Sequence, residues 1–150
     1  MEVKERILFE DNHLLVIHKS AGELVQGDRT GDPTLADFVK AYLKKKYLKP
    51  GAVFLGVVHR LDRPTSGVLV FAKTSKALRR LNQQFQSRIP KKTYWAIVTK
   101  EFTDQKGTLS HWMTRNTKQN KSKAHIKEVP NSKLAKLQYQ RVKDLDHYCL

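Results

Sequence analysis

Apolar residues occur in short blocks along the chain, separated by clusters of charged and turn-forming residues. Most blocks are rich in Val, Ile, Leu and aromatic side chains, a composition that is typical of strands. The pattern predicts strands at residues 7–9, 14–17, 53–58, 68–72, 92–99, 108–113, 124–129 and 135–142, and the start of another at 147–150. In the 135–142 segment, the alternation of side chains places Ala135, Leu137 and Tyr139 on one face.

Two other segments have the spacing of an amphipathic helix. In the first helix the inward positions would be Leu35, Phe38, Val39, Tyr42 and Leu43. Asp32 as the N-cap and Pro33 as the first helical residue are a favourable start for it. A second helix is expected from a Ser75 cap to about residue 88, before Pro90 ends it.

The order of these elements indicates an α+β domain, in which helices flank a mixed, largely antiparallel sheet. A doubly wound nucleotide-binding fold is disfavoured, because helices do not follow most of the strands and no Gly-x-Gly-x-x-Gly motif occurs. A chain of 150 residues is long enough for one domain with its own core.

Composition narrows the class of protein further. The longest apolar run is far shorter than the roughly 20 residues that a membrane-spanning helix needs, and the first residues lack a signal-peptide pattern. Cys149 is the only cysteine, so neither an intramolecular disulfide nor a multi-cysteine zinc site can form. These features predict a reduced, cytoplasmic protein.

The net charge of the chain indicates what kind of molecule it binds. The formal net charge is +15, and residues 38–100 hold 15 basic side chains but a single acidic one, Asp62. So strong a positive balance favours a polyanion, with RNA or DNA as the first candidate, although a merely solvated basic surface is also compatible with it. Nearby positive charges would favour the ionised form of an isolated carboxylate, which a nucleophile or general base requires, so Asp62 is the first candidate for a catalytic residue.

The segment around Asp62, residues 59–67 (HRLDRPTSG), is expected to form a polar loop between two apolar strands. Loops positioned by strands often carry catalytic side chains, although this composition is also that of an ordinary turn. The Gly-x-Ser-x-Gly elbow of serine hydrolases is absent, and the six histidines lack metal-ligand spacing. The sequence therefore predicts neither a serine hydrolase nor a metal site.

Residues 59–67, followed by Ala72 and Lys73, resemble the His-Arg-Leu-Asp-x-x-Thr-Ser-Gly signature of the RluA-type pseudouridine synthases. Residues 11–22 are similar to that family's N-terminal block, with Ser20 where proline is usual, and residues 91–98 match its Lys-x-Tyr-x-Ala-x-Val strand. The resemblance covers at least residues 7–100. It implies the pseudouridine synthase fold and the isomerisation of uridine in rRNA or tRNA, without metal or cofactor.

The resemblance also implies roles for individual residues. Asp62 would be the catalytic carboxylate, acting as a nucleophile at C1′ or as a base at C2′. Tyr94 would pack on the uracil and remove the C5 proton, although an alternating strand could equally hold it as a core tyrosine. Arg60, next to Asp62, would help to hold the target base out of its stack, because a base inside the stack cannot be reached.

The remaining candidates are expected to contact RNA. Lysines and arginines would bind phosphates without reading the base sequence, while loop residues would lie near the reacting nucleotide. The set consists of His59, Arg63, Thr65, Lys73, Lys76, Arg79, Arg80, Arg88, Lys91 and Lys92.

The family's Thr-Gly-Arg-x-His-Gln-Ile-Arg block, which includes an active-site arginine, is not found before Leu150. The catalytic domain, residues 1–150, is therefore expected to be incomplete at its C-terminus. This leaves a second hypothesis, a non-catalytic RNA-binding or RNA-chaperone domain that keeps the fold. DNA binding ranks third, because neither a helix-turn-helix nor a zinc-finger pattern is present.

Overall fold

The computed structural model describes residues 2–27, 30–100, 104–117, 119 and 121–150. The chain divides into two compact units, Met1–Lys91 and Lys92–Leu150, and each is described by itself. Its helices and antiparallel strands confirm the α+β class predicted from the sequence.

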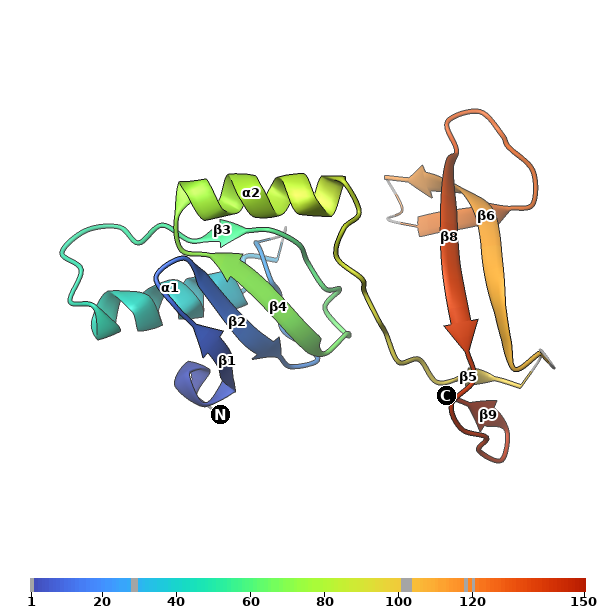
Figure 1. The fold of residues 1–150 in the computed structure, drawn as a ribbon, viewed down its shortest axis with the longest axis horizontal. Coiled ribbons are helices and arrows are strands. Elements are labelled where there is room, and N and C mark those ends of the chain that lie inside the picture. Colours follow the sequence, from blue (N-terminus) through green and yellow to red (C-terminus); the bar gives the residue numbers. More distant parts are fainter. Residues whose placement is uncertain (1, 28–29, 101–103, 118, 120) are drawn as a thin grey trace. The chain divides into compact units, whose positions relative to one another are not determined.

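The first unit is a four-stranded antiparallel sheet with two α-helices (Figure 1). Its strands follow the order β1-β2-β4-β3 across the sheet. The elements are η1 (Val3–Arg6), β1 (Ile7–Glu10), β2 (Leu14–Lys19), α1 (Leu35–Lys46), β3 (Gly56–Val57), β4 (Gly67–Ala72) and α2 (Ser75–Gln86). The strands at 7–9, 14–17 and 68–72 are confirmed, whereas the one expected at 53–58 is reduced to the two residues of β3.

The core lies between α1 and one face of this sheet. Alternate residues of β2 and β4 are fully buried, as are the residues of α1 that recur every four positions. The buried cluster consists of Leu15, Ile17, Val25, Leu35, Ala36, Val39, Leu43, Leu69 and Phe71. Phe38, which the helical spacing placed on the inner face, remains 46% exposed. At the β3 edge, α2 packs so closely that a Cβ on Gly56 would lie 2.9 Å from Leu78 Cδ1.

Both helices begin at residues other than those predicted. Thr34 caps α1 through a reciprocal capping box, since its Oγ1 accepts the N–H of Asp37 at 3.2 Å and the Asp37 carboxylate accepts the N–H of Thr34 at 3.2 Å. Asp32 lies outside the helix and pairs with Arg63 instead. Thr74, rather than Ser75, caps α2 by accepting the N–H of Ala77 at 3.2 Å.

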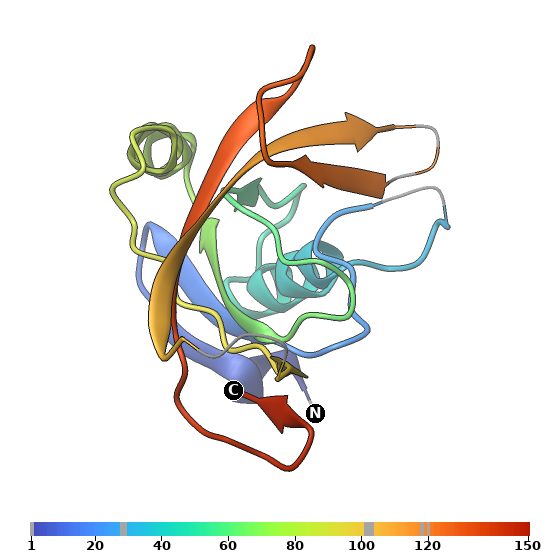
Figure 2. The ribbon, with the colours of Figure 1, turned by 90° about the vertical axis from the view of Figure 1, so that its right-hand side faces the viewer.

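The second unit contains β5 (Val98–Thr99), β6 (Lys106–Asn116), β7 (Lys121–His125), β8 (Lys133–Gln140) and β9 (Tyr148–Cys149). Strand β6 is the centre of a twisted three-stranded sheet with the order β7-β6-β8, while β5 pairs with β9 (Figure 2). Tyr139 and Leu137 lie on one face, as the alternation predicted, and Tyr139 covers Gly107 on the neighbouring strand.

The strand expected at 92–99 is wrong over most of its length. Only Val98–Thr99 forms a strand, and residues 92–97 are exposed and unpaired by any described strand. A strand needs a neighbour to take its backbone N–H and C=O groups, so alternation alone does not produce one. The strand expected at 124–129 also lies earlier, at Lys121–His125, because it forms a hairpin with β6.

Candidate active site

The polar loop of residues 59–67 connects β3 to β4 in the first unit, and it carries Asp62. It ends at Gly67, whose φ of +148° lies in the region that L residues rarely adopt. The N–H of Thr65 donates to the Asp62 carbonyl at 3.0 Å, which closes a turn around the candidate catalytic residue. The loop is therefore a defined structure rather than an irregular connection.

Lys19, the last residue of β2, supports this loop through hydrogen bonds to its backbone. Its side chain is fully buried, and its ammonium donates to the carbonyl oxygens of Asp62 at 3.1 Å, Arg63 at 3.1 Å and Thr65 at 2.6 Å. A fourth bond runs to the carbonyl of Ser20 at 3.1 Å. Burial lowers the pKa of the ammonium below its ordinary value, while the Glu23 and Asp62 carboxylates oppose this shift. The Lys19 ammonium thus provides hydrogen bonds to three backbone carbonyls of the loop that carries Asp62.

Arg63 joins the loop to the segment that follows β2. The N–H of Gly22 donates to the Arg63 carbonyl at 2.7 Å, and Arg63 Nε donates back to the Gly22 carbonyl at 3.1 Å. Its guanidinium also pairs with Asp32 at 3.0 Å. Arg63, predicted as an RNA contact, therefore already holds two neighbouring loops together.

The segment after β2 is fixed in turn by an ion pair between a buried arginine and a partly buried glutamate. Arg6 donates to both carboxylate oxygens of Glu23, at 2.8 and 2.7 Å, and is only 7% exposed. The N–H of Ser20 donates to the same carboxylate at 2.8 Å. Burial alone would raise the pKa of Glu23, but these hydrogen bonds hold it below its ordinary value. The support of the Asp62 loop therefore extends back to η1.

His59 fixes the other end of the loop. Its Nε2 accepts the backbone N–H of Val70 at 3.1 Å, which requires this nitrogen to be unprotonated. The imidazole also stacks on the Phe85 ring of α2, with centroids 5.0 Å apart and planes inclined by 18°. These contacts give His59 a structural task beside the RNA contact predicted for it.

The side chains of Asp62 and Arg60 are both exposed. Within the part of the chain that the structure describes, no hydrogen bond or ion pair occupies the Asp62 carboxylate or the Arg60 guanidinium. Thr65 is half-buried, with its carbonyl directed at Lys19. The loop thus uses its backbone for support and leaves a carboxylate and a guanidinium for other partners.

Most of the predicted phosphate contacts lie on or after α2. Lys76, Arg79 and Arg80 are exposed on the helix, and Arg88 and Lys91 follow it in the same unit. None of these five forms an ion pair with a carboxylate among the described residues, and α2 itself contains no acidic residue. This part of the first unit is therefore a basic surface whose charge is not neutralised locally.

Lys73 is different, because its ammonium is already committed. It pairs with Glu10 at 2.8 Å, donates to the carbonyl of Asp11, and lies over the Tyr47 ring at 4.7 Å. The Lys73 side chain is only 9% exposed, and its pKa is raised because the bonds to Glu10 and Tyr47 outweigh its burial. This geometry favours a structural role over the RNA contact predicted for Lys73.

Tyr94 and Lys92 belong to the second unit. The Tyr94 ring is 58% exposed on the extended segment that precedes β5, so it is not the core tyrosine of an alternating strand. Lys92 is exposed as well.

Lys19 is the residue that sequence analysis missed at this site. A signal was present, because Leu15, Ile17 and Lys19 alternate along one strand and the first two are apolar. Period-two alternation places all three on the buried face, and a buried lysine requires partners. Among the described residues, no cluster of three metal-ligating side chains occurs here or elsewhere.

Comparison with known proteins assigns the family. The family model described as RNA pseudouridylate synthase matches residues 13–150. The chain belongs to this family. The match includes the whole Asp62 loop, its support by Lys19 and the segment that carries Tyr94.

Individual relatives agree. The chain is 41% identical over 101 residues to the ribosomal large subunit pseudouridine synthase C of Vibrio vulnificus, and 42% identical over 92 residues to that of Escherichia coli. These alignments cover 67% and 61% of the chain but only 30% and 27% of the relatives. The chain thus spans less than a third of the curated relatives that it matches.

Solved structures show the same fold. Human RNA Pseudouridylate Synthase Domain Containing 4 superposes with a TM-score of 0.79 at 23% identity, over 98% of this chain and 57% of that one. The human domain-containing protein 1 gives a TM-score of 0.72 at 21% identity. No described helix is both long and apolar enough to cross a membrane.

Proposed function

We propose that this chain carries the reaction centre of an RNA pseudouridine synthase, with Asp62 as its catalytic carboxylate. The observation that supports this most directly is the structure of the Asp62 loop. Hydrogen bonds that involve Lys19, Gly22 and His59 fix the loop and its ends, while the carboxylate stays exposed. Positioning a reacting group within a fixed geometry is worth much of a catalytic barrier. A residue selected only for a turn would not need a buried ammonium beneath it.

The proposed reaction rearranges the substrate without adding or removing atoms. The N1–C1′ bond of the uridine breaks, the uracil turns, and a C5–C1′ bond forms in its place. The hydrogen on C5 leaves as a proton, and N1 takes one up. Asp62 acts either by attacking C1′, which makes a covalent intermediate of the kind that carboxylates form in glycosidases, or by removing a proton from C2′ and returning it there when the C5–C1′ bond forms.

Two further residues have proposed roles in this reaction. Tyr94 packs on the uracil and accepts the C5 proton, for which an exposed phenol is better suited than a buried one. Arg60 helps to hold the nucleotide outside its stack, at a site where its guanidinium has no carboxylate partner among the described residues. Extruding a base costs a few kcal/mol, which contacts of this kind must offset.

The proposed substrate is ribosomal RNA. Its support is the name of the relatives, ribosomal large subunit pseudouridine synthase C, together with the basic surface of the first unit. That surface consists of Lys76, Arg79, Arg80, Arg88 and Lys91, with Lys92 beyond it. Transfer RNA is the second candidate. The cytoplasm is the proposed location, because ribosomal RNA is processed there in bacteria such as Vibrio vulnificus and Escherichia coli.

Replacing the carboxylate tests the proposal. We expect Asp62→Asn to lower the rate of tritium release from C5-labelled uridine in ribosomal RNA by about 10²–10⁴-fold or more, while RNA affinity changes little. The matched control is Asp146→Asn, which removes an exposed carboxylate of the second unit and should leave the rate unchanged.

The same experiment separates catalysis from binding alone. If Asp62→Asn forms pseudouridine at the rate of the unmodified protein, the catalytic assignment is wrong. If neither protein releases tritium from any cellular RNA, yet both bind RNA and complement a deletion equally, the chain is an RNA-binding domain that retains the fold.

A further inference from the structure

The three-stranded sheet of the second unit has two chemically different faces. Directly paired residues of antiparallel strands share a face, and neighbours along a strand alternate between faces. One face carries Leu109, Met113, Ala124, Ala135, Leu137 and Tyr139 together with His111, Arg115 and Lys133, and Leu109 and Leu137 are exposed by 44% and 53%. The opposite face carries Trp112 and Leu134 among polar side chains, and we term it the lysine face.

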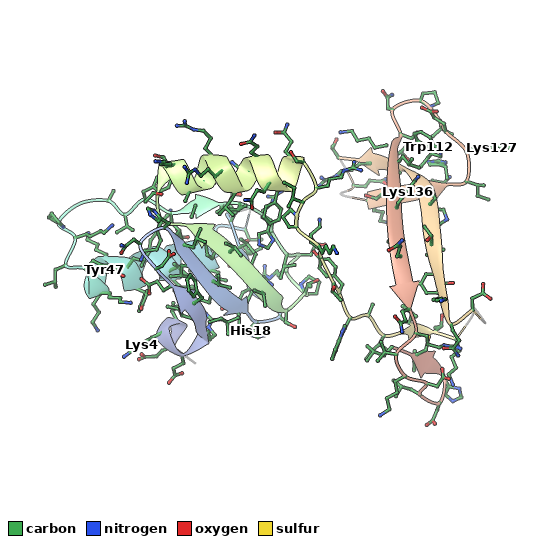
Figure 3. All side chains as sticks on the ribbon, viewed as in Figure 1. Lys4, His18, Tyr47, Trp112, Lys127 and Lys136 are labelled. Atoms are coloured by element: carbon green, nitrogen blue, oxygen red, sulfur yellow. The ribbon has the colours of Figure 1, made fainter. Side chains whose placement is uncertain are left out.

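The lysine face is defined by Lys106, Lys121, Lys123 and Lys136, which surround Trp112 and His125. Trp112 lies in the central strand, directly between His125 on β7 and Leu134 on β8. Trp112 and Lys136 are labelled in Figure 3. The remaining positions are hydroxyl and amide side chains, so the face presents hydrogen-bond donors around one aromatic ring.

Nothing within the sheet neutralises this charge. Strands β6, β7 and β8 contain no Asp or Glu. The four lysines are exposed, and none forms an ion pair with a carboxylate among the described residues. Lys46 and Lys73 differ from these four, since both contact Glu10 at 2.8 Å. A face with four lysines and no acid is suited to a polyanion rather than to water alone.

The dimensions of the face also fit an extended nucleic acid strand. Lys121 lies opposite Asn116 at one end of β6, and Lys106 lies at the other end. At about 3.3 Å per residue, the lysines are spread over a length of about 33 Å. Single-stranded nucleic acids bind to grooves or surfaces that combine spaced cations with aromatic rings, on which bases stack.

We propose that the lysine face binds a single-stranded segment of the substrate RNA, with the four lysines on phosphates and Trp112 stacked against a base. This inference rests on the proposed function for the identity of the polyanion as RNA. It assigns an RNA contact to residues of the second unit, in addition to the Asp62 loop and the basic residues of the first unit. His125, which shares a hydrogen bond with Thr114 Oγ1 at 3.0 Å, fixes the hairpin beside Trp112.

The test measures binding of purified protein to a fluorescein-labelled oligouridylate at several salt concentrations. Each phosphate contact on a single strand contributes about 0.7 to the slope of log K against log salt. Lys121→Gln, Lys123→Gln and Lys136→Gln together should therefore lower the slope by about 2. The matched control is the triple variant Lys44→Gln, Lys45→Gln and Lys49→Gln. These three lysines are exposed, and their replacement removes the same amount of charge. It should leave the slope nearly unchanged.

A second pair of variants tests the stacking. We expect Trp112→Leu to weaken binding by about 5- to 150-fold, and Trp112→Phe to retain most of the affinity because it keeps a ring. If the lysine-face triple and the control triple lower the slope equally, only net charge matters and the proposal fails. It also fails if Trp112→Leu binds as tightly as the unmodified protein.

Failure of this inference is distinguishable from failure of the proposed function. Tritium release that persists with an unchanged salt slope in the lysine-face variants would refute the surface and leave the enzyme assignment intact. Conversely, a slope that depends on the lysine face in a protein that never releases tritium would refute the enzyme and leave an RNA-binding surface.

Discussion

Lys19→Met is the most informative perturbation of the Asp62 loop. It keeps an unbranched apolar stem in a site that is fully buried, and it removes only the ammonium. The change leaves the carbonyl oxygens of Ser20, Asp62, Arg63 and Thr65 without the donor that lies 2.6 to 3.1 Å from each. The expected result is a loop that relaxes toward water while the rest of the first unit keeps its structure.

The magnitude follows from those contacts. Hydrogen bonds to a charged group are worth about 1.5–3 kcal/mol each, but burying the ammonium costs several kcal/mol, which cancels part of their sum. Removing one partner of a buried charged group usually costs about 3–5 kcal/mol. Because the loop lies at the surface, water can reach some of its carbonyls after relaxation, so we expect a loss of about 2–4 kcal/mol in the free energy of unfolding.

The effect on activity should exceed the effect on RNA binding. Lys19 is buried and cannot touch RNA, whereas the position of Asp62 depends on it, and a displacement of about 1 Å can cost on the order of 10²-fold in rate. We therefore expect kcat to fall about 10²-fold, with RNA affinity within about threefold, where a tenfold change corresponds to about 1.4 kcal/mol. Urea unfolding and single-turnover tritium release measure the two quantities.

Two control variants sharpen the test. Lys45→Met removes an exposed lysine of α1 that has no ion-pair partner among the described residues, and it should change neither stability nor rate. Lys19→Ala with added propylammonium should recover part of the lost rate, because the free amine can occupy the vacated site. If Lys19→Met lowers stability but leaves kcat within about threefold, the ammonium supports the fold only, and the positioning argument is refuted.

Two further predictions concern stability. Burial alone would raise the pKa of Glu10, but hydrogen bonds from its lysine and tyrosine neighbours hold it at about 2 against an ordinary value of 4.5. A depressed carboxyl pKa contributes stability above pH 4.5 that is lost as the pH falls toward 2, here roughly 3 kcal/mol, so Glu10→Gln should flatten the unfolding free energy over that interval in acid titrations. Gly67→Ala should lower stability by about 1–3 kcal/mol in thermal melts, because its φ is +148° and the new Cβ would lie 3.3 Å from Leu61, whereas Gly51→Ala, in open space, should be close to neutral.

The sequence predicts this fold well where periodicity and burial coincide. The alternation of Leu15 and Ile17 and the helical spacing of Leu35, Val39 and Leu43 correspond to buried faces of β2 and α1. Prediction fails where a segment forms a strand only if a neighbouring strand is there to pair with it. Residues 92–97 alternate as a strand should, yet no described strand pairs with them, so their backbone stays extended and exposed.

The same distinction applies to the helix caps. Asp32 and Thr34 are both good N-cap residues, and local preference cannot choose between them. The choice depends on Asp37, which completes the capping box with Thr34, and on Arg63, which pairs with Asp32 from a loop distant in sequence. The sequence shows the first of these partners three residues away, but the second depends on how the chain folds.

The sequence predicts how many basic residues the candidate site region contains, but it does not predict which of them pair with carboxylates. Arg63, Lys73 and Arg79 look alike in the sequence, as basic residues within one strongly positive region. In the structure, Asp32 holds Arg63 and Glu10 holds Lys73, whereas Arg79 is exposed with no carboxylate partner among the described residues. The difference lies in acidic residues from the N-terminal part of the chain, which pair across the fold.

This division of charge bears on how the protein would bind RNA. A lysine or arginine that already contacts a carboxylate must give up that contact to take a phosphate, so it gains little from the exchange. A cation without such a partner gains the full release of counterions from the RNA. Among the cations without an ion pair in the described residues, those on α2 and on the lysine face lie on the proposed RNA contacts, so they should account for most of the salt dependence of binding. The paired groups instead hold the Asp62 loop and the sheet in place, so that their loss would be measured in stability and rate.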